Sequence, residues 1–193
     1  MAFSPDGKYV LTGSSDRTAI LWDFQGKVIR TFKSHKGDVL SVAFSPDGKY
    51  ILAGCYKNSA ILWDLQGRKI QTFKGRYFFY DINAVAFAPD GKSLLTSGNT
   101  DNNTVTLWDI KGHKIQDFKG SVNAYITSVA FSPDGKHILT GNGDITATLW
   151  DLEGHELQVY KGHTSSVEAV SFSPEGRYVL TGSKDNTIKL WDL

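Results

Sequence analysis

The chain has 193 residues, of which 21 are Lys or Arg and 20 are Asp or Glu, so its formal net charge is only +1. A protein that binds nucleic acid through its phosphates normally carries a basic excess, so this balance argues against a nucleic-acid partner. The single cysteine, Cys55, excludes an intrachain disulfide and favours a reducing compartment, so we expect a cytoplasmic location. No stretch approaches 18 uncharged apolar residues and no signal-peptide pattern opens the sequence, so we expect no membrane attachment.

Short segments with strand character follow one another from the amino terminus. The first four cover residues 9–12, 19–22, 27–32 and 39–44; they are rich in β-branched and aromatic residues and are separated by Gly, Ser, Asp and Asn. The same order of segments returns along the chain, and no window keeps a helical period over 11 or more residues. The sequence therefore predicts an all-β chain with four strands in each repeating unit.

Two short patterns mark the repeats. All five tryptophans precede an aspartate, and the pairs recur at intervals of 41 to 45 residues, a period typical of four-stranded repeats. All five prolines stand in a Phe-Ser-Pro-Asp-Gly pattern or a close variant, such as residues 3–7, and this composition predicts a tight turn between two strands. Residues 1–193 are thus predicted to form a single array, whose repeat units end at Asp23, Asp64, Asp109, Asp151 and Asp192.

With Trp-Asp ending one strand, Ser-Pro-Asp-Gly in a following turn and Gly162-His163 upstream of the last repeat, the chain closely resembles the WD-repeat (WD40) β-propeller family over essentially its whole length. The resemblance implies about five blades, each an antiparallel four-stranded sheet, around a central channel that docks proteins or peptides. The close similarity of the copies to one another resembles WD-repeat arrays of bacterial signalling proteins.

In the WD-repeat family, a buried network of His, Ser or Thr, Asp and Trp links the strands of a blade. Only the last repeat of this chain has all four residues, as His163, Thr181, Asp185 and Trp191. These residues resemble a catalytic triad, but the repeat places them between strands, where buried polar groups must satisfy one another. We therefore expect a structural network there and no catalytic residue.

The other repeats depart from the network. The first keeps Thr12, Asp16 and Trp22, and the fourth keeps Thr140, Asp144 and Trp150. The second keeps His35 and Trp63, and the residues that replace network members are Ala53 and Lys57 in the second repeat, Arg76 in the third and Ser121 in the fourth. We expect these blades to depend more on apolar packing.

Both terminal repeats are expected to be incomplete. Met1 stands where the other copies have valine, which shortens the first inner strand, and the sequence stops just after the last Trp-Asp pair, so only four outer strands are expected. An unpaired edge strand invites pairing with another chain. The sequence therefore favours either a segment of a longer propeller or a chain that closes or assembles by an unusual route, for example as a homo-oligomer.

Patterns for catalysis and for cofactor binding are missing from the sequence. No P-loop, nucleophile elbow or His-Glu-x-x-His helix occurs, and the five histidines do not have the spacing of a metal cluster. The carboxylates recur in every repeat, whereas a catalytic pair would be expected once. We therefore expect no enzyme activity, no cofactor and no metal.

Differences between the repeats are expected to hold the binding function, because loops on a rigid scaffold often carry it. The loop before the third inner strand is longer and contains Arg76, Tyr77, Phe78, Phe79 and Tyr80, residue types enriched among those whose truncation costs about 2 kcal/mol or more at interfaces. Either this segment anchors a partner, or Phe78 or Phe79 packs between blades. The family resemblance adds rim positions that face a partner, namely Asp38, Leu40, Tyr56, Asp81, Asn83, Tyr125, Thr127, Ser166, Glu168 and Lys184.

Three hypotheses about function are compatible with these observations. The leading one is a noncatalytic scaffold that recognises a protein or peptide, as the sensor segment of a larger signalling protein. The second is a structural module whose incomplete blades drive oligomerisation. The third, an enzyme with its site in the channel, is disfavoured because no nonrepeated group of catalytic residues occurs.

Overall fold

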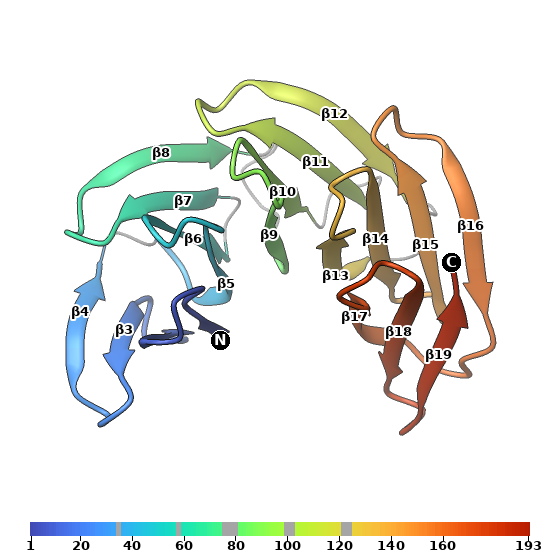
Figure 1. Ribbon diagram of the computed structural model, residues 1–193, viewed down its shortest axis with the longest axis horizontal. Helices are drawn as coiled ribbons and strands as arrows, with labels where there is room; N and C mark the ends of the chain where they lie inside the picture. The colour runs from blue at the N-terminus through green and yellow to red at the C-terminus, as the bar shows by residue number, and fades with distance from the viewer. Residues whose placement is uncertain (34–35, 57–58, 75–80, 99–102, 121–124) are drawn as a thin grey trace.

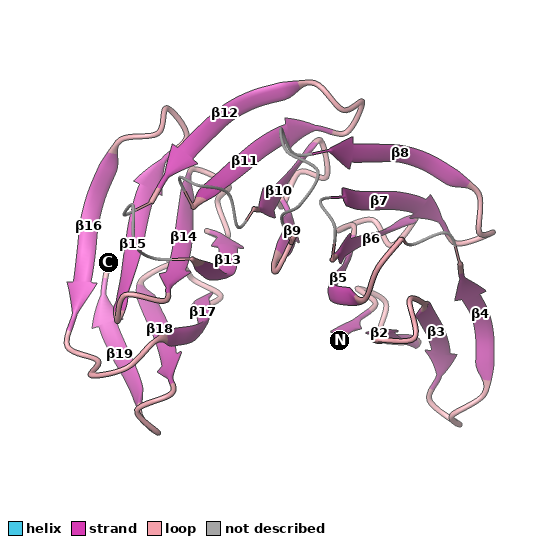
Figure 2. Cartoon of the chain, turned by 180° about the vertical axis from the view of Figure 1, so that it is seen from behind, coloured by secondary structure: helices cyan, strands magenta, loops and turns pink. Residues whose placement is uncertain are grey.

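A computed structural model shows the fold and describes residues 1–33, 36–56, 59–74, 81–98, 103–120 and 125–193. These residues form 19 β-strands in five antiparallel sheets (Figure 2). In the part of the chain that is described, no helix is long and apolar enough to cross a membrane.

Each sheet is built from strands that are consecutive in sequence, and we number the sheets as blades one to five. Blade one contains β1 (Ala2–Phe3), β2 (Tyr9–Gly13), β3 (Ala19–Asp23) and β4 (Val28–Phe32). Blade two contains β5 (Val39–Phe44), β6 (Tyr50–Cys55), β7 (Ser59–Asp64) and β8 (Lys69–Lys74). Blade three contains β9 (Val85–Phe87), β10 (Ser93–Ser97), β11 (Thr104–Asp109) and β12 (Lys114–Lys119). Blade four contains β13 (Ile126–Phe131), β14 (His137–Asn142), β15 (Thr146–Asp151) and β16 (Glu156–Lys161), and blade five contains β17 (Val167–Phe172), β18 (Tyr178–Ser183) and β19 (Ile188–Asp192).

The blades stand side by side in an open arc (Figure 1). The first strand of each blade lies on the inside of the arc, and β4, β8, β12 and β16 lie on the outside. Blades one and five are the two ends of the arc. The predicted β-propeller with incomplete terminal blades is confirmed: blade one keeps four strands with a two-residue β1, and blade five has three strands.

The Pro-Asp-Gly turns form as their composition predicts. In blade one, the Ser4 hydroxyl accepts the Tyr9 amide at 2.9 Å and donates to Asp6 at 2.7 Å. The Gly7 amide donates to the Ser4 carbonyl at 2.9 Å, and Gly7 has a φ of 67°, which glycine adopts without steric cost. Blades two and four repeat these bonds through Ser45 and Ser132.

Each blade packs one apolar face, its forward face, on the backward face of the next blade. An aromatic ring from the outer strand contacts the tryptophan of the following blade at all four junctions. The ring centroids are 5.9 Å apart for Phe32 and Trp63, 5.8 Å for Phe73 and Trp108, 6.2 Å for Phe118 and Trp150, and 5.5 Å for Tyr160 and Trp191. At the first junction the buried residues are Leu11, Ala19, Leu21 and Phe32 of blade one with Val42, Phe44, Ile51 and Trp63 of blade two.

The two end faces of the arc are not covered in this way. Leu180, on the forward face of blade five, is 42% exposed, whereas its counterpart Leu139 in blade four is 0% exposed. Ile188 and Leu190 on the same face are also exposed. On the backward face of blade one, the exposed apolar residues are Met1, Phe3 and Phe24, and the rings of Phe3 and Phe24 stack at 6.2 Å.

The same substitution at the same position of two repeats should therefore have unequal effects on stability. We expect Leu139→Ala to lower the free energy of unfolding by about 3 kcal/mol, because it leaves a cavity in a packed junction. Leu180→Ala should lower it by less than about 1 kcal/mol, because water already reaches that side chain. Urea denaturation of both variants tests this difference. A large loss for Leu180→Ala would mean that its face is covered in solution.

Candidate functional site

The structure brings the four predicted network residues together inside blade five. His163 Nε2 lies 2.8 Å from Thr181 Oγ1, and His163 Nδ1 lies 2.8 Å from Asp185 Oδ2. Trp191 Nε1 donates to Thr181 Oγ1 at 2.9 Å. A neutral His163 with its proton on Nδ1 satisfies all three contacts, since Nε2 then accepts from the Thr181 hydroxyl. Thr181 is only 1% exposed, so its hydroxyl is sealed from any substrate.

Asp185 is the charged member of this network. The hydroxyl of Thr187 donates to it at 2.6 Å, and the Thr164 amide and His163 also bond to it. These bonds, with that of Thr187 the largest, hold the pKa of Asp185 well below its usual value of 3.8. Because the folded-state pKa is the lower one, the stabilisation is present above about pH 4 and is lost as the pH falls towards the folded-state pKa.

Three of the other blades keep the hydrogen bond between the tryptophan and the threonine of the network. The tryptophan indole donates to a threonine hydroxyl at 2.8 Å in blade one, 2.9 Å in blade three and 3.2 Å in blade four. Blade two has Ala53 in place of this threonine and so lacks the hydroxyl. The donor and acceptor pairs are Trp22 and Thr12, Trp108 and Thr96, and Trp150 and Thr140. His35, Lys57, Arg76 and Ser121 lie outside the described residues.

Four of the predicted rim residues gather at one rim of blades four and five. Lys184 Nζ lies 3.1 Å from Glu168 Oε1, and the Ser166 hydroxyl donates to the same oxygen at 2.6 Å. The hydrogen bond that Lys184 donates to Glu168 is the largest cause that raises the pKa of Lys184, and nearby Tyr125 adds to it. The Ser166 hydroxyl likewise lowers the pKa of Glu168. Tyr125 is 40% exposed. The cluster therefore combines an exposed aromatic ring with the ion pair of Glu168 and Lys184.

Tyr56 of blade two and Tyr125 are exposed rim residues, and each is held over a glycine. A Cβ atom on Gly143 would lie 2.6 Å from the Tyr125 ring, and the Gly143 amide donates to the Tyr125 carbonyl at 2.8 Å. A Cβ atom on Gly37 would lie 2.6 Å from the Tyr56 carbonyl oxygen. Both glycines lie far from their tyrosine in the sequence, so no local pattern indicated these close approaches.

Asn83 and Thr127 also lie at this edge, but their side chains bond to the next blade. Asn83 Nδ2 donates to the Ile126 carbonyl at 3.4 Å. The Thr127 hydroxyl lies within hydrogen-bond distance of the carbonyls of Gly141, in its own blade, and Val167, in blade five. These two residues therefore contribute to joining the blades where the rim is formed.

The remaining predicted rim residues have varied surroundings. Asp81 and Asp38 are half-buried, whereas Leu40 is 44% exposed. The predicted aromatic anchor lies outside the described residues, and it comprises Arg76, Tyr77, Phe78, Phe79 and Tyr80.

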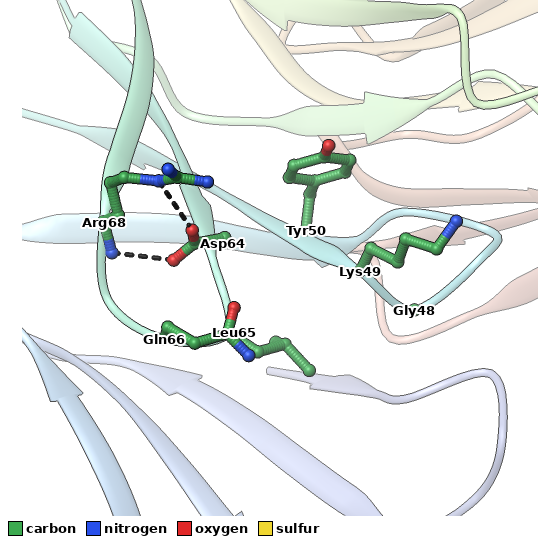
Figure 3. A pocket seen from close by; sticks show the side chains of 7 residues that line it. All are labelled: Gly48, Lys49, Tyr50, Asp64, Leu65, Gln66 and Arg68. Carbon is green, nitrogen blue, oxygen red and sulfur yellow. Dashed lines mark hydrogen bonds and ion pairs between the residues drawn. The ribbon is translucent and has the colours of Figure 1, made fainter.

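A pocket of about 350 Å³ lies at the opposite edge of blade two (Figure 3). Arg68 dominates it, donating through its amide and its Nε to the carboxylate of Asp64 at 2.7 and 3.0 Å. Blades three and four have a histidine in place of Arg68, and each binds the corresponding aspartate at 2.7 Å. This pairing of a basic side chain with the aspartate of the Trp-Asp pair occurs in three blades, where it closes the following turn. We therefore assign it a structural role.

Among the residues that the structure describes, no three His, Cys, Asp or Glu side chains gather where they could hold a metal ion. Cys55 is fully buried, and burial raises the pKa of its thiol to about 12, so it is a packed side chain and not a ready nucleophile.

Consecutive antiparallel sheets in an arc, each with a Trp-Asp pair at the end of its third strand, define a WD-repeat β-propeller. Residues 1–192 match the family described as IFT122 first beta-propeller, and the chain belongs to this family. Over 47 residues it is 51% identical to Ribosomal RNA-processing protein 9 of Saccharomyces cerevisiae, an alignment that covers 22% of this chain and 8% of that protein. WD-repeat propellers are in general noncatalytic scaffolds that bind proteins.

Removal of the His163 ring should destabilise blade five, because the buried side chains of Asp185 and Thr181 would each lose a hydrogen-bond partner. We expect His163→Ala to lower the free energy of unfolding by about 2 kcal/mol. His113→Ala is the matched control, since the His113 ring is 77% exposed and should contribute less than about 1 kcal/mol. Urea denaturation and amide exchange of β18 and β19 report the change. Equal losses in the two variants would contradict a structural network.

Proposed function

We propose that this chain is a noncatalytic, cytoplasmic scaffold that binds a protein or peptide at one rim of its arc, as the sensor segment of a larger signalling protein. The binding surface, which we call the rim site, consists of Tyr56, Tyr125, Glu168 and Lys184. The observation that carries the proposal is the meeting of Tyr125 with the Glu168 and Lys184 pair, because this cluster is not repeated in the other described blades.

The chemistry of the rim site suits the recognition of a polypeptide. Tyrosine offers a large contact area at low entropic cost and is enriched among the residues that dominate binding energy. Glu168 and Lys184 are 41% and 59% exposed in their side chains, so both charges can exchange partners with an incoming backbone or side chain. Glu168 lies in β17, and the other three residues directly precede or follow a strand, so their backbone is held before binding, which lowers the entropic cost of association.

The absence of catalysis is proposed from the network in blade five. His163, Thr181 and Asp185 are ordered like a triad, but the His163 side chain is 2% exposed and Thr181 also accepts the Trp191 indole hydrogen. A nucleophile must reach a substrate, and this hydroxyl faces only its own blade. The three groups therefore support the fold.

The rim site can be tested with peptides selected from a random display library against the wild-type chain. We expect Tyr125→Ala and Tyr56→Ala each to weaken binding of the selected peptides by about tenfold or more, because hot-spot truncations cost about 2 kcal/mol. Titration calorimetry measures the affinity, and thermal unfolding checks that the variants keep the fold.

Ile115→Ala is the matched control, since Ile115 is 54% exposed on the outer strand β12, away from the rim. Its peptide affinity should equal that of the wild type. If the double variant of Tyr56 and Tyr125 binds the peptides as tightly as the wild type, the rim site is not the binding surface.

A second candidate function is self-assembly through the ends of the arc. It is favoured by the uncovered forward face of blade five, where Ile188 is 72% and Leu190 64% exposed, and by the uncovered backward face of blade one. Contiguous apolar surface of this kind marks an interaction site. The edge of β19 is also open to another strand among the described residues.

Self-assembly predicts a mass above that of the monomer at micromolar concentration. Leu190→Lys together with Ile188→Lys should restore the monomer, because burial of two lysines on an apolar face is costly. Leu157→Lys on the outer strand β16 is the control and should leave the mass unchanged. Size-exclusion chromatography with light scattering decides the matter, and a monomeric wild-type chain at high concentration would exclude this function.

A further inference from the structure

A cavity of about 400 Å³ opens between blades three and four, at the edge of the arc opposite the rim site. Apolar side chains form its inner wall, and Ser93 and two carboxylates complete it. The lining residues that matter here are Ser93, Leu107, Phe131, Leu152, Asp90 and Asp134.

The first two junctions of the arc show what normally fills this place. Ser93 is the counterpart of Tyr9 in blade one and Tyr50 in blade two. Tyr9 packs in the apolar cluster of Leu21, Phe44 and Leu65, and these are the counterparts of Leu107, Phe131 and Leu152. Tyr50 packs in the same way among Leu62, Phe87 and Ile110. The cavity is therefore a place that the repeat shapes for a tyrosine ring, and blade three has a serine there.

A second departure from the repeat occurs at the mouth of the same cavity. Blade three has Ala88 where the other blades have the turn serine, so the hydroxyl that binds the turn aspartate is missing. In blade four, by contrast, the Ser132 hydroxyl donates to Asp134 at 2.6 Å and lowers its pKa. Asp90 accepts the Lys92 amide at 2.9 Å, and the missing serine leaves its carboxylate with acceptor capacity for a ligand.

The mouth carries two carboxylates, of which Asp134 also lies 3.9 Å from Lys136 Nζ in an exposed pair that a ligand cation could replace. A Cβ atom on Gly135 would lie 3.6 Å from Pro89 Cδ, so the turns of blades three and four are in contact beside the opening. Asp90 and Asp134 belong to these two turns. Two carboxylates at the mouth of an apolar cavity favour a ligand with a positive charge next to an aromatic ring.

We propose that this cavity binds the side chain of a tyrosine that lies next to a lysine or arginine in a partner polypeptide. The ring takes the place that Tyr9 and Tyr50 hold in their own junctions, and the basic residue pairs with Asp90 and Asp134. Ser93 offers a hydroxyl beside the ring. The site lies away from the rim site and does not depend on it.

The probe is N-acetyl-Arg-Tyr-amide, titrated into the uniformly ¹⁵N-labelled chain. We expect saturable shifts of the amides of Ser93, Phe131 and Leu152, and binding about two- to fivefold tighter than that of N-acetyl-Glu-Tyr-amide, as one or two exposed ion pairs provide. Ser93→Tyr should abolish these shifts and raise the urea midpoint, because it fills the cavity from within. Asp90→Asn should reduce the preference for the arginine peptide and leave ring binding intact.

Tyr50→Ser supplies the matched gain of function, since it should open the equivalent cavity at the second junction and add a second set of shifts around Leu62 and Phe87. The proposal is overturned if the wild-type chain shows no saturable shifts, or if Ser93→Tyr binds the probe as well as the wild type does. Equal binding of an alanine peptide, N-acetyl-Arg-Ala-amide, would also overturn it, because charge alone would then explain the contact.

Discussion

The contact between the ring at the end of each outer strand and the tryptophan of the following blade holds this array together. It occurs at all four junctions, with centroids 5.5 to 6.2 Å apart. Aromatic pairs of this geometry contribute about 0.5–1.5 kcal/mol beyond the area that they bury. The outer strand of one blade and the inner strand of the next are consecutive in the sequence, so blades that follow one another in the chain also pack on one another. The cavity between blades three and four depends on that packing.

The fold could be predicted from the sequence because its signals are local and repeated. The turn at residues 3–7 needs only the chemistry of Ser, Pro, Asp and Gly in adjacent positions, and five copies of it leave little choice of topology. The shortened first strand and the missing last outer strand also followed from counting copies.

The rim could be predicted only in part. The family resemblance indicated that Tyr125, Glu168 and Lys184 lie at one edge, but how near Tyr125 of blade four comes to Lys184 of blade five depends on the distance between two blades, which no local pattern contains. Asn83 illustrates the same limit: the resemblance predicted an edge position for it, whereas its bond to the Ile126 carbonyl depends on how blades three and four face each other. The cavity beside Ser93 likewise depends on the packing of two blades, because Phe131 and Leu152 of blade four form part of its wall.

The uncovered end faces have a consequence for how the arc loses its structure. Repeat proteins behave approximately as a row of units that are each stabilised by their neighbours. Within the arc that residues 1–193 form, an inner blade has two neighbours, whereas blades one and five have one each, so melting of this arc should proceed as fronts that enter from its two ends. Blade five carries the complete His163 network and blade one does not, so the two fronts should advance unequally, and the junction between blades two and three or three and four should be the last to open.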